Sequence, residues 1–267
     1  MPFVSEALNY EIPPDAAQLW RYMDVGRFLT MLYESVLHFA WPWALGDPWE
    51  GVPMAYIDEI REHWSIEVRN TLLTGHIARR TVVSSWHENS RESIAMWKLY
   101  TSGAEGVAIQ TTVGRLKKVF DGQRNFVRLA RVRYGDHADA LPVSGWVDIQ
   151  PLIFKRSCHE HEREVRALIV HPFELVAPED GGEPVQVPVY DPPRGQGLGL
   201  RVDLVELVER IVVSPRYPPW AVPALQQMVK RAGLTIQIES SDVSRRPDGC
   251  VGPEDDASGP KAESASA

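Results

Sequence analysis

The chain has 267 residues, of which 44% are hydrophobic and 24% charged, a composition typical of a globular protein that can bury a substantial core. Its formal net charge of -8 does not favour a non-specific nucleic-acid binder, because such proteins are usually basic. The two cysteines, Cys158 and Cys250, are too far apart to suggest a disulfide framework, and no Cys/His cluster indicates zinc.

The first residues, MPFVSEALNYEIPPD, lack the basic stretch followed by an apolar run that marks a signal peptide. No stretch reaches the ~18 apolar residues that a membrane span needs. We therefore expect a cytoplasmic protein with no membrane partner. The expected organisation is an N-terminal arm (1–15), a single domain (16–242) and a disordered tail (243–267) that has almost no large apolar residue.

The hydrophobic spacing of the first half predicts strands that alternate with helices. In chain order, these are a buried strand at 19–23, a helix at 24–36, a strand at 36–42, a turn at 46–51, a helical segment at 54–80, a strand at 81–86, a loop running into a helix at 87–101, and a strand at 106–112. Asp24 is the expected N-cap of the first helix. Asn89 or Ser90 is expected to cap the helix that carries Ile94, Met96, Trp97 and Tyr100 at its apolar positions.

The second half predicts more strands than helices. The expected elements are a basic amphipathic helix from 113, a half-exposed strand at 126–135, a segment at 149–169 that begins helical and ends in a strand, a loop or hairpin at 178–199, a strand at 207–215, a helix at 218–233 and a last strand at 234–240. Strands that alternate with helices early and cluster late indicate an α+β fold, with a mixed and mainly antiparallel sheet flanked by helices.

No GxGxxG, P-loop, GxSxG or HExxH motif occurs in the sequence, so the common catalytic motifs do not assign a function. The candidate residues must come from polar groups in unusual positions. Arg21 is the first, because an arginine within a buried strand needs an anion or a carboxylate to offset its desolvation. The alternative is that Arg21 pairs with a nearby glutamate or points outward.

Two polar loops follow. Asp47 and Glu50 lie in GDPWEG, where a structural turn is the default interpretation. His87, Glu88 and Asn89 directly follow a strand, and loops at strand ends often carry function. The aromatic residues on the next helix, Trp97 and Tyr100, are more often core than ligand platform.

The segment HEHEREVRALI places Glu162, Glu164 and Arg166 at alternate positions leading into a strand, so that alternation would put all three on one side of the chain. Two carboxylates beside a cation can bind a cationic ribose-like transition state or a pair of hydroxyl groups. A solvated edge strand with an acid–base ladder is the structural alternative. His159 and His161 in a charged turn are weak evidence for a metal, and we expect none.

Together these motifs resemble the bacterial family called domain of unknown function 2971. The motifs that carry the resemblance are Trp20-Arg21-Tyr22, the Asp-Pro-Trp-Glu turn at 47–50, SWHEN at 85–89 with MWKLY at 96–100, the strand GVAI at 106–109 and the closing Glu-x-Glu-x-Arg at 162–166. The resemblance covers residues 19–170, with weaker support to 238. The chain departs from the family with Gly46, with Ser84-Ser85-Trp86 and with Lys98-Leu99, where the family usually has Asn, Cys-Phe-Ser and Ser-His.

The order of a first-strand arginine and a late strand entered through Glu-x-Glu is also similar to that of ADP-ribosyltransferases. That resemblance implies that Glu164 stabilises the oxocarbenium ion and that Glu162 positions the acceptor or ribose. It implies that Arg21 holds the phosphates of NAD, with Tyr22 close by, and that Trp97 or Tyr100 stacks on nicotinamide. NAD would then be a substrate, and the partner a small-molecule nucleotide rather than a nucleic acid.

Two other functions remain open at this point. One is a non-catalytic module that binds a nucleotide or a protein, with Glu50, Glu88 and Arg166 in a structural ion network. The other is a nuclease with Asp47, Glu50, Glu88 and Glu164 on Mg²⁺. All three hypotheses predict that these residues converge: Arg21, Glu50, Glu88, Trp97, Tyr100, Glu164 and Arg166.

Overall fold

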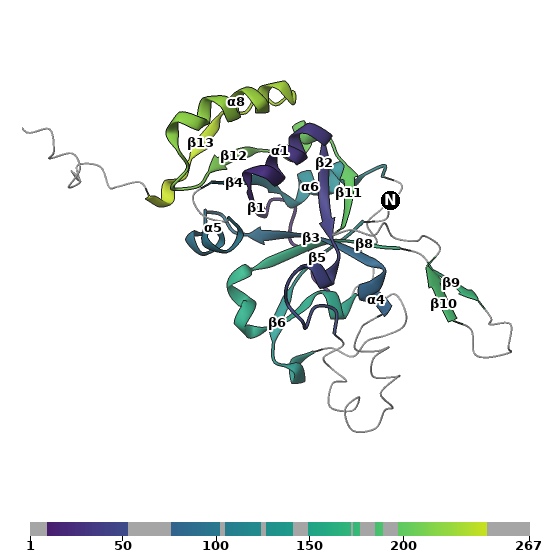
Figure 1. Ribbon diagram of the computed structural model, residues 1–267. Coiled ribbons are helices and arrows are strands. Elements are labelled where there is room, and N and C mark those ends of the chain that lie inside the picture. The colour runs from purple at the N-terminus through teal and green to yellow at the C-terminus, as the bar shows by residue number, and fades with distance from the viewer. Residues whose placement is uncertain are drawn as a thin grey trace, which may run out of the picture.

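The computed structural model describes residues 10–52, 76–101, 105–123, 127–140, 149–171, 173–176, 185–188 and 197–244. Most of the helical segment expected at 54–80, most of the loop or hairpin expected at 178–199, and all but residues 243–244 of the tail expected at 243–267 lie outside these ranges. Within them, the chain forms an α+β fold with a mixed, mostly antiparallel sheet flanked by helices (Figure 1).

The strands, in chain order, are β1 (Gln18–Asp24), β2 (Val36–Ala40), β3 (Thr81–Glu88), β4 (Gly106–Thr112), β5 (Val127–Arg131), β6 (Arg133–Gly135), β7 (Phe154–Arg156), β8 (Glu164–Val170), β9 (Phe173–Val176), β10 (Val185–Pro188), β11 (Gly197–Arg201), β12 (Arg210–Val213) and β13 (Ile238–Ser240). The α-helices are α1 (Val25–Glu34), α4 (His76–Arg79), α5 (Ile94–Tyr100), α6 (Val113–Phe120), α7 (Leu204–Leu207) and α8 (Val222–Arg231). Short 3₁₀ helices include η1 (Pro42–Ala44), η4 (Gln150–Leu152), η5 (Ser157–Glu162) and η6 (Pro219–Ala221).

Strand β3 is the branch point of the main sheet. One path through the described strands runs β11-β2-β3-β1-β4-β12-β13, and β3 also pairs with β8, which in turn pairs with β5. All of these pairs are antiparallel except β12–β13. Because β8 pairs with β3 over residues 81–87, β1 and β2 share the other edge of β3 at its two ends, and the sheet divides along β3 between them.

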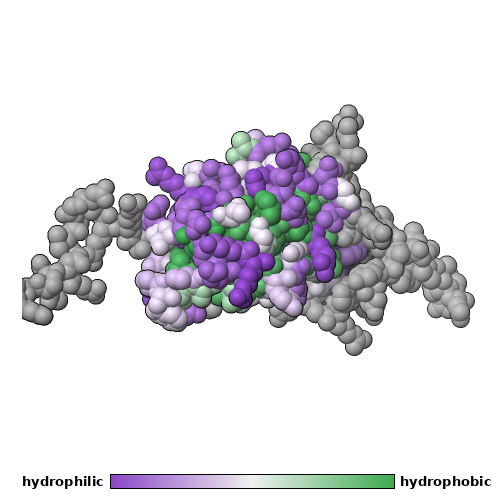
Figure 2. Space-filling model, turned by 90° about the horizontal axis from the view of Figure 1, so that it is seen from above, coloured by the Kyte–Doolittle hydropathy of each residue, from purple (hydrophilic) through white to green (hydrophobic). Residues whose placement is uncertain are grey.

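The core lies on both faces of this sheet. The larger cluster joins one face to α1, α6, α7 and α8, with Phe28, Leu116, Leu207 and Val229 as buried contributions from these helices. Figure 2, seen from above, shows hydrophilic residues bordering a hydrophobic area in the middle of that view. Two smaller clusters cover other parts of the sheet, one with α4 and η4 and one with α5.

Local signals placed many elements correctly. Asp24 caps α1, where its side chain accepts a hydrogen bond from the amide of Arg27 at 2.8 Å. The strand expected at 106–112 is β4, and the helix that follows it is α6 with Thr112 as its N-cap. The late helix is α8, although it begins at Val222, four residues after the predicted start.

The predicted N-cap of α5 was wrong. Strand β3 continues to Glu88 because His87 and Glu88 pair with β1, so Asn89 and Ser90 leave the strand without starting a helix. Ser93 is the cap, and its hydroxyl accepts from the amide of Met96. The short helix buries Met96 and Trp97, whereas Ile94 and Tyr100 are 49% and 41% exposed, so the predicted apolar face was too wide.

Three further predictions needed correction. The strand expected at 126–135 breaks at Val132, whose amide bonds to Glu164 while Arg133 turns to pair with β7. The helical start expected from 149 consists of the 3₁₀ helices η4 and η5 with β7 between them. The last strand is confined to Ile238–Ser240, since that is where the chain pairs with β12.

Candidate functional site

A cavity of about 720 Å³ lies where the sheet divides along β3. Within the described ranges, β1 pairs with β3 through Leu19–Glu88 and Trp20–His87, and β2 pairs with β3 through Ala40–Val83. The opposite edge of β1 pairs with β4 along its whole length, and the opposite edge of β2 pairs with β11. The first half of β2 and the second half of β1 therefore line an opening whose size is typical of a small-molecule site.

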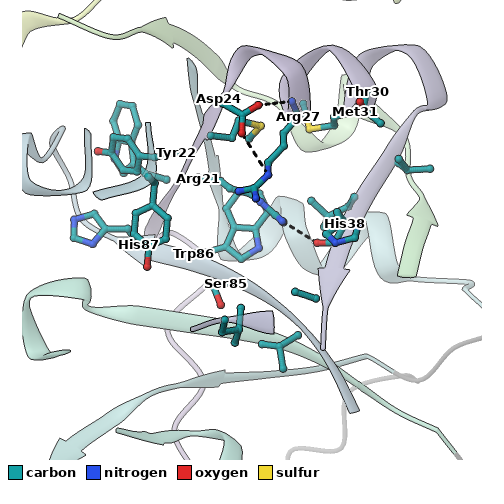
Figure 3. Close-up of a pocket in the computed structure, with 18 of the residues that line it drawn as sticks. Arg21, Tyr22, Asp24, Arg27, Thr30, Met31, His38, Ser85, Trp86 and His87 are labelled. Carbon is teal, nitrogen blue, oxygen red and sulfur yellow. Dashed lines mark hydrogen bonds and ion pairs between the residues drawn. The ribbon is translucent and has the colours of Figure 1, made fainter. Parts of the chain in front are cut away.

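Arg21 spans this opening. Its Nη2 donates to the main-chain carbonyl of His38 on β2 at 2.8 Å, its Nη1 donates to the hydroxyl of Ser84 on β3, and its guanidinium carbon is 5.6 Å from the centroid of Trp86. Figure 3 shows Arg21 extending over Trp86 toward His38. Burial, and secondarily the charge of Arg27, lowers the pKa of Arg21 to about 10, so the group is a cation at neutral pH.

No carboxylate among the described residues forms a salt bridge with Arg21. Its partners in the described ranges are a carbonyl, a hydroxyl and an aromatic ring, none of which carries a negative charge. Arg27, at the start of α1, lines the same cavity and pairs with Asp24 at 3.4 Å. The pKa of His38 is lowered by burial and by these two arginines, so His38 is neutral at pH 7. Arg21 thus gives this end of the cavity a cation able to bind an anion, beside Arg27 and its partner Asp24.

An aromatic wall stands toward α5. Tyr22 packs edge-on against Trp97, with ring centroids 4.9 Å apart, and its hydroxyl accepts from the amide of Ser93 at 2.9 Å. Trp97 is 3% exposed, donates from Nε1 to Glu92 and is not among the residues that line the cavity. Tyr100 does line it. Burial, followed by the charges of Glu162 and Glu164, raises the pKa of Tyr100 above its usual value.

Glu164 lies at the base of the cavity, in a charged cluster that is almost fully buried. Arg166 binds both of its oxygens, from Nε to Oε1 at 2.7 Å and from Nη2 to Oε2 at 3.1 Å. The Nζ of Lys155 is also 3.1 Å from Oε2. Behind them, the carboxylate of Glu50 accepts from both Nη atoms of Arg166 at 2.6 and 2.8 Å.

These contacts set the charge state of Glu164. Burial alone would raise its pKa, but Arg166 and Lys155 outweigh burial, and a hydrogen bond with Ser85 acts in the same direction. The pKa of Glu164 is lowered to about 2, so the side chain is a carboxylate at neutral pH. Arg166 and Lys155 have raised pKa values for the reciprocal reason and remain protonated.

Glu162 belongs to this cluster, but its position in the chain's structure differs from the predicted one. It belongs to η5 rather than to the strand, so strand alternation does not place it beside Glu164. Lys155 brings the two together, because its Nζ contacts Glu162 at 2.6 Å as well as Glu164. His159 lies between Glu162 and Asp47, at 3.3 and 3.2 Å.

The structure brings some of the predicted residues together and separates others. Arg21, Tyr22, Tyr100, Glu162 and Glu164 line the cavity. Glu50 and Arg166 lie behind Glu164 in the same cluster. Asp47 binds Arg156 and His159 outside the described lining.

Glu88 and Asn89, at the end of β3, contact different side chains. Glu88 is held by Arg131 through two bonds of 2.7 Å, and it is not among the lining residues. The amide of Asn89 lies 3.3 Å from the Nε2 of His87, which does line the cavity. Among the residues expected to converge, Glu88 and Trp97 are adjacent to lining residues but do not themselves line the cavity.

The four carboxylates considered as Mg²⁺ ligands do not form one group. Asp47 and Glu88 have separate cationic partners, while Arg166 binds both Glu50 and Glu164. Across the described part of the chain, no cluster of three or more His, Cys, Asp or Glu side chains has the geometry of a metal site.

Sequence reasoning missed Lys155, Ser84, Ser85, His38 and Arg27 as members of the site. Lys155 was invisible because its role depends on β7 and β8 lying together, which no local pattern reveals. Ser84 and Ser85 had a usable signal, since two adjacent small hydroxyl residues within a buried strand need polar partners on both faces. Ser84 bonds to Arg21 and Ser85 to Glu164.

Comparisons with known proteins add little. No family model matches the chain, and no curated protein matches it. Among solved structures, the chain is similar to DarT of Thermus sp. 2.9 in complex with ADP-ribosylated ssDNA, at 12% sequence identity and a TM-score of 0.36. The similarity covers 88% of this chain and 98% of that chain. At this level the likeness supports no functional conclusion. In the described residues, no helix has the length and apolar character needed to cross a membrane.

Proposed function

We propose that the cavity binds NAD and that the protein breaks the glycosidic bond between nicotinamide and ribose, passing ADP-ribose to an acceptor or to water. The observation that carries the proposal is that Arg21 and the ionised Glu164 line the same cavity, one bonded to Ser84 and the other to Ser85 on β3. Adjacent strand residues point to opposite faces of a sheet. Ser84 therefore holds Arg21 on one face and Ser85 holds Glu164 on the other, and the two side chains line the cavity from opposite faces of the divided sheet.

The cationic end suits the pyrophosphate of a dinucleotide. Arg21 is a protonated guanidinium with no carboxylate partner among the described residues, and Arg27 lies nearby. A planar guanidinium binds phosphate oxygens through two parallel N–H donors, which a lysine cannot reproduce. Bound phosphate would compensate a charge for which the described residues supply no carboxylate.

The anionic end suits the reaction itself. As nicotinamide leaves, positive charge develops on the ribose, and a fixed carboxylate in a site shielded from water stabilises that charge. Glu164 is ionised, nearly buried and held by several bonds, so it needs no reorganisation during the reaction. Tyr22 and Tyr100 supply aromatic surface for the leaving nicotinamide.

This arrangement resembles that of ADP-ribosyltransferases, in which a first-strand Arg and a late-strand Glu act on NAD. The likeness is an analogy of architecture, and a shared architecture does not by itself define a reaction. We also propose that the chain is a member of the family called domain of unknown function 2971, which it resembles in sequence.

A second candidate function is a non-catalytic module that binds a nucleotide or a protein. One observation favours it: both oxygens of Glu164 are already bound by cations, which reduces the negative charge that the cavity presents. In that case Glu164 would serve to compensate Arg166 and Lys155. Its loss would then affect folding more than any activity.

The experiment that tests the proposal is nicotinamide release from NAD, followed by NMR for the wild type, Glu164→Gln and Glu88→Gln, with a melting curve for each. Glu88 is a matched control because it is also paired with an arginine but is not among the lining residues. We expect release by the wild type and by Glu88→Gln, and a loss of at least ~100-fold in folded Glu164→Gln. If the wild type neither releases nicotinamide nor melts at a higher temperature with millimolar NAD, the proposal is wrong.

A further inference from the structure

His87 is the feature of this cavity that the proposed function does not use. In the β3–β8 ladder it is the direct partner of Glu164, and in the β1–β3 ladder it is the partner of Trp20. Directly opposed residues of antiparallel strands project to the same face. His87 and Glu164 are therefore neighbours on one face of the sheet, and both line the cavity (Figure 3 shows His87 beside Tyr22).

The hydrogen bonds of His87 define its tautomer. Nδ1 lies 2.7 Å from the main-chain carbonyl oxygen of Glu162, and a carbonyl can only accept, so Nδ1 carries the proton and donates. The lone pair of Nε2 then accepts from the side-chain Nδ2 of Asn89 at 3.3 Å, a long hydrogen bond that the incoming nucleophile would replace. A fixed donor bond at one ring nitrogen orients the other as a base.

The surroundings keep this imidazole neutral. Burial lowers the pKa of His87 below its usual value; the backbone bond to Glu162 opposes the shift, while Arg163 and His161 add to it. The titratable and charged groups that face His87 from its own strand and its neighbours are Glu162, Glu164, Arg163, His161 and Tyr22. A neutral imidazole can accept a proton at pH 7, whereas an imidazolium cannot.

Glu164, the carboxylate opposite His87, is poorly suited to accept a proton. Glu164 is bound by Arg166 and Lys155, and these cations hold its pKa at about 2. Glu162 is bound by Lys155 at 2.6 Å and faces His159 at 3.3 Å. The pairing of Glu164 with Arg166 and Lys155 makes it a weak base. His87 has no cation within hydrogen-bonding distance in the described structure.

We propose that the Nε2 of His87 accepts the proton of the attacking nucleophile in the reaction at Glu164; the inference rests on the proposed function. The bond between ribose C1′ and the nicotinamide nitrogen breaks, and its electron pair neutralises the pyridinium ring, so the leaving group needs no proton. A bond forms between C1′ and the oxygen of water or an acceptor hydroxyl. The proton of that oxygen moves to Nε2, which makes His87 an imidazolium until it passes the proton to solvent.

The test uses the full-length protein, NAD, and either water or sodium azide as the nucleophile. Azide has no proton to lose, so it needs no base. We expect His87→Asn, which keeps a donor for the Glu162 carbonyl, to lower nicotinamide release in water by about 100-fold or more. Azide should restore most of that rate with formation of ADP-ribosyl azide, detected by mass spectrometry. His171, which packs against Trp41 and is not among the lining residues, provides a matched control, and His171→Asn should behave as the wild type.

Different outcomes separate this inference from the proposed function. A wild type without nicotinamide release overturns both. An active wild type with a folded His87→Asn of equal rate overturns the role of His87 alone. A slow variant that azide does not accelerate gives His87 a structural role and also overturns the inference. Where His87→Asn fails to fold, the wild-type pH profile decides, since the rate must fall as pH falls through the imidazole pKa measured by NMR.

Discussion

Arg21 on β1 donates to the main-chain carbonyl of His38 on β2 at 2.8 Å, across the opening in the sheet. That carbonyl belongs to a strand whose other edge is occupied by β11. In the described residues, β2 and β3 pair at a single position, Ala40–Val83. The Arg21 side chain thus supplies a hydrogen-bond donor to β2 where β3 supplies no paired residue. Arg21 both links β1 to β2 and lines the cavity, so it combines a structural role with the proposed ligand-binding role.

Replacing Arg21 with lysine separates these roles. A lysine keeps the charge but loses the planar fork, so we expect the rise in melting temperature caused by NAD to be largely lost. The carbonyl of His38 and the hydroxyl of Ser84 lose donors, which should cost about 1–3 kcal/mol of stability. Differential scanning fluorimetry with and without NAD measures both effects. Arg210→Lys, at a surface pair with Glu239, is the control, and an equal loss of the NAD effect there would contradict the prediction.

The buried cluster around Arg166 predicts a large effect on stability. Arg166 is 0% exposed and bonds to Glu50, Glu164 and the carbonyl of Leu152. Arg166→Met leaves two buried carboxylates with Lys155 as their remaining partner, and we expect a loss of about 3–5 kcal/mol in urea unfolding. Arg131→Met is the comparison, since its pairs with Glu88 and Glu11 are more exposed and should contribute about 1 kcal/mol or less. Similar losses in the two variants would mean that burial of the cluster is not what matters.

The lowered pKa of Glu164 predicts how its contribution depends on pH. The carboxylate has a pKa of about 2 in the folded protein, against 4.5 as the ordinary value. Its stabilisation is fully present above the ordinary value and is lost as pH falls toward the folded value, a change on the order of 3 kcal/mol. The difference in unfolding free energy between the wild type and Glu164→Gln should therefore shrink between about pH 6 and about pH 3.5. A constant difference over this range would show that Glu164 is not held as a carboxylate.

Two glycines in the same loop provide a packing test. Gly51 has φ +75°, and a Cβ there would lie 2.6 Å from the Cβ of Ala78 and 3.2 Å from Leu152. Gly46 has φ +85°, with nothing within 4 Å of such a Cβ. Gly46→Ala should cost about 1–2 kcal/mol from backbone strain alone. Gly51→Ala should cost clearly more, because Ala78 must also move and Gly51 follows Glu50 of the charged cluster. Thermal melts of the two variants compare them directly, and the opposite order would contradict the packing.

Much of the fold could be predicted because its signals are local. The cap at Asp24, the apolar spacing of α1 and the uniform apolar run of β4 depend on neighbours within a few residues. The N-cap of α5 could not be found in this way. The extra length of β3 comes from pairing with Leu19 and Trp20, almost 70 residues earlier in the chain.

The site was predictable in its charged members and not in their arrangement. Arg21 and Glu164 stand out because charges within apolar strands need a reason. The position of Lys155 between Glu162 and Glu164 depends on how η5 returns the chain from β7 to β8, and no spacing in the sequence specifies that path. Glu88 was misplaced because a polar cluster after a strand does not reveal which face each side chain takes. Arg131, which holds Glu88, comes from β5.

The pairing of β11 with β2 has a consequence for how the protein is made. Residues 36–40 emerge from the ribosome well before their neighbours at 197–201. Gly199, on β11, lines the cavity. Strand β4 likewise pairs with a strand synthesised much later, β12. A nascent chain that stops before this point leaves β2 as an open edge, which is prone to pairing with other chains. The lining of the ligand cavity is therefore complete only after β11 has been synthesised and has paired with β2.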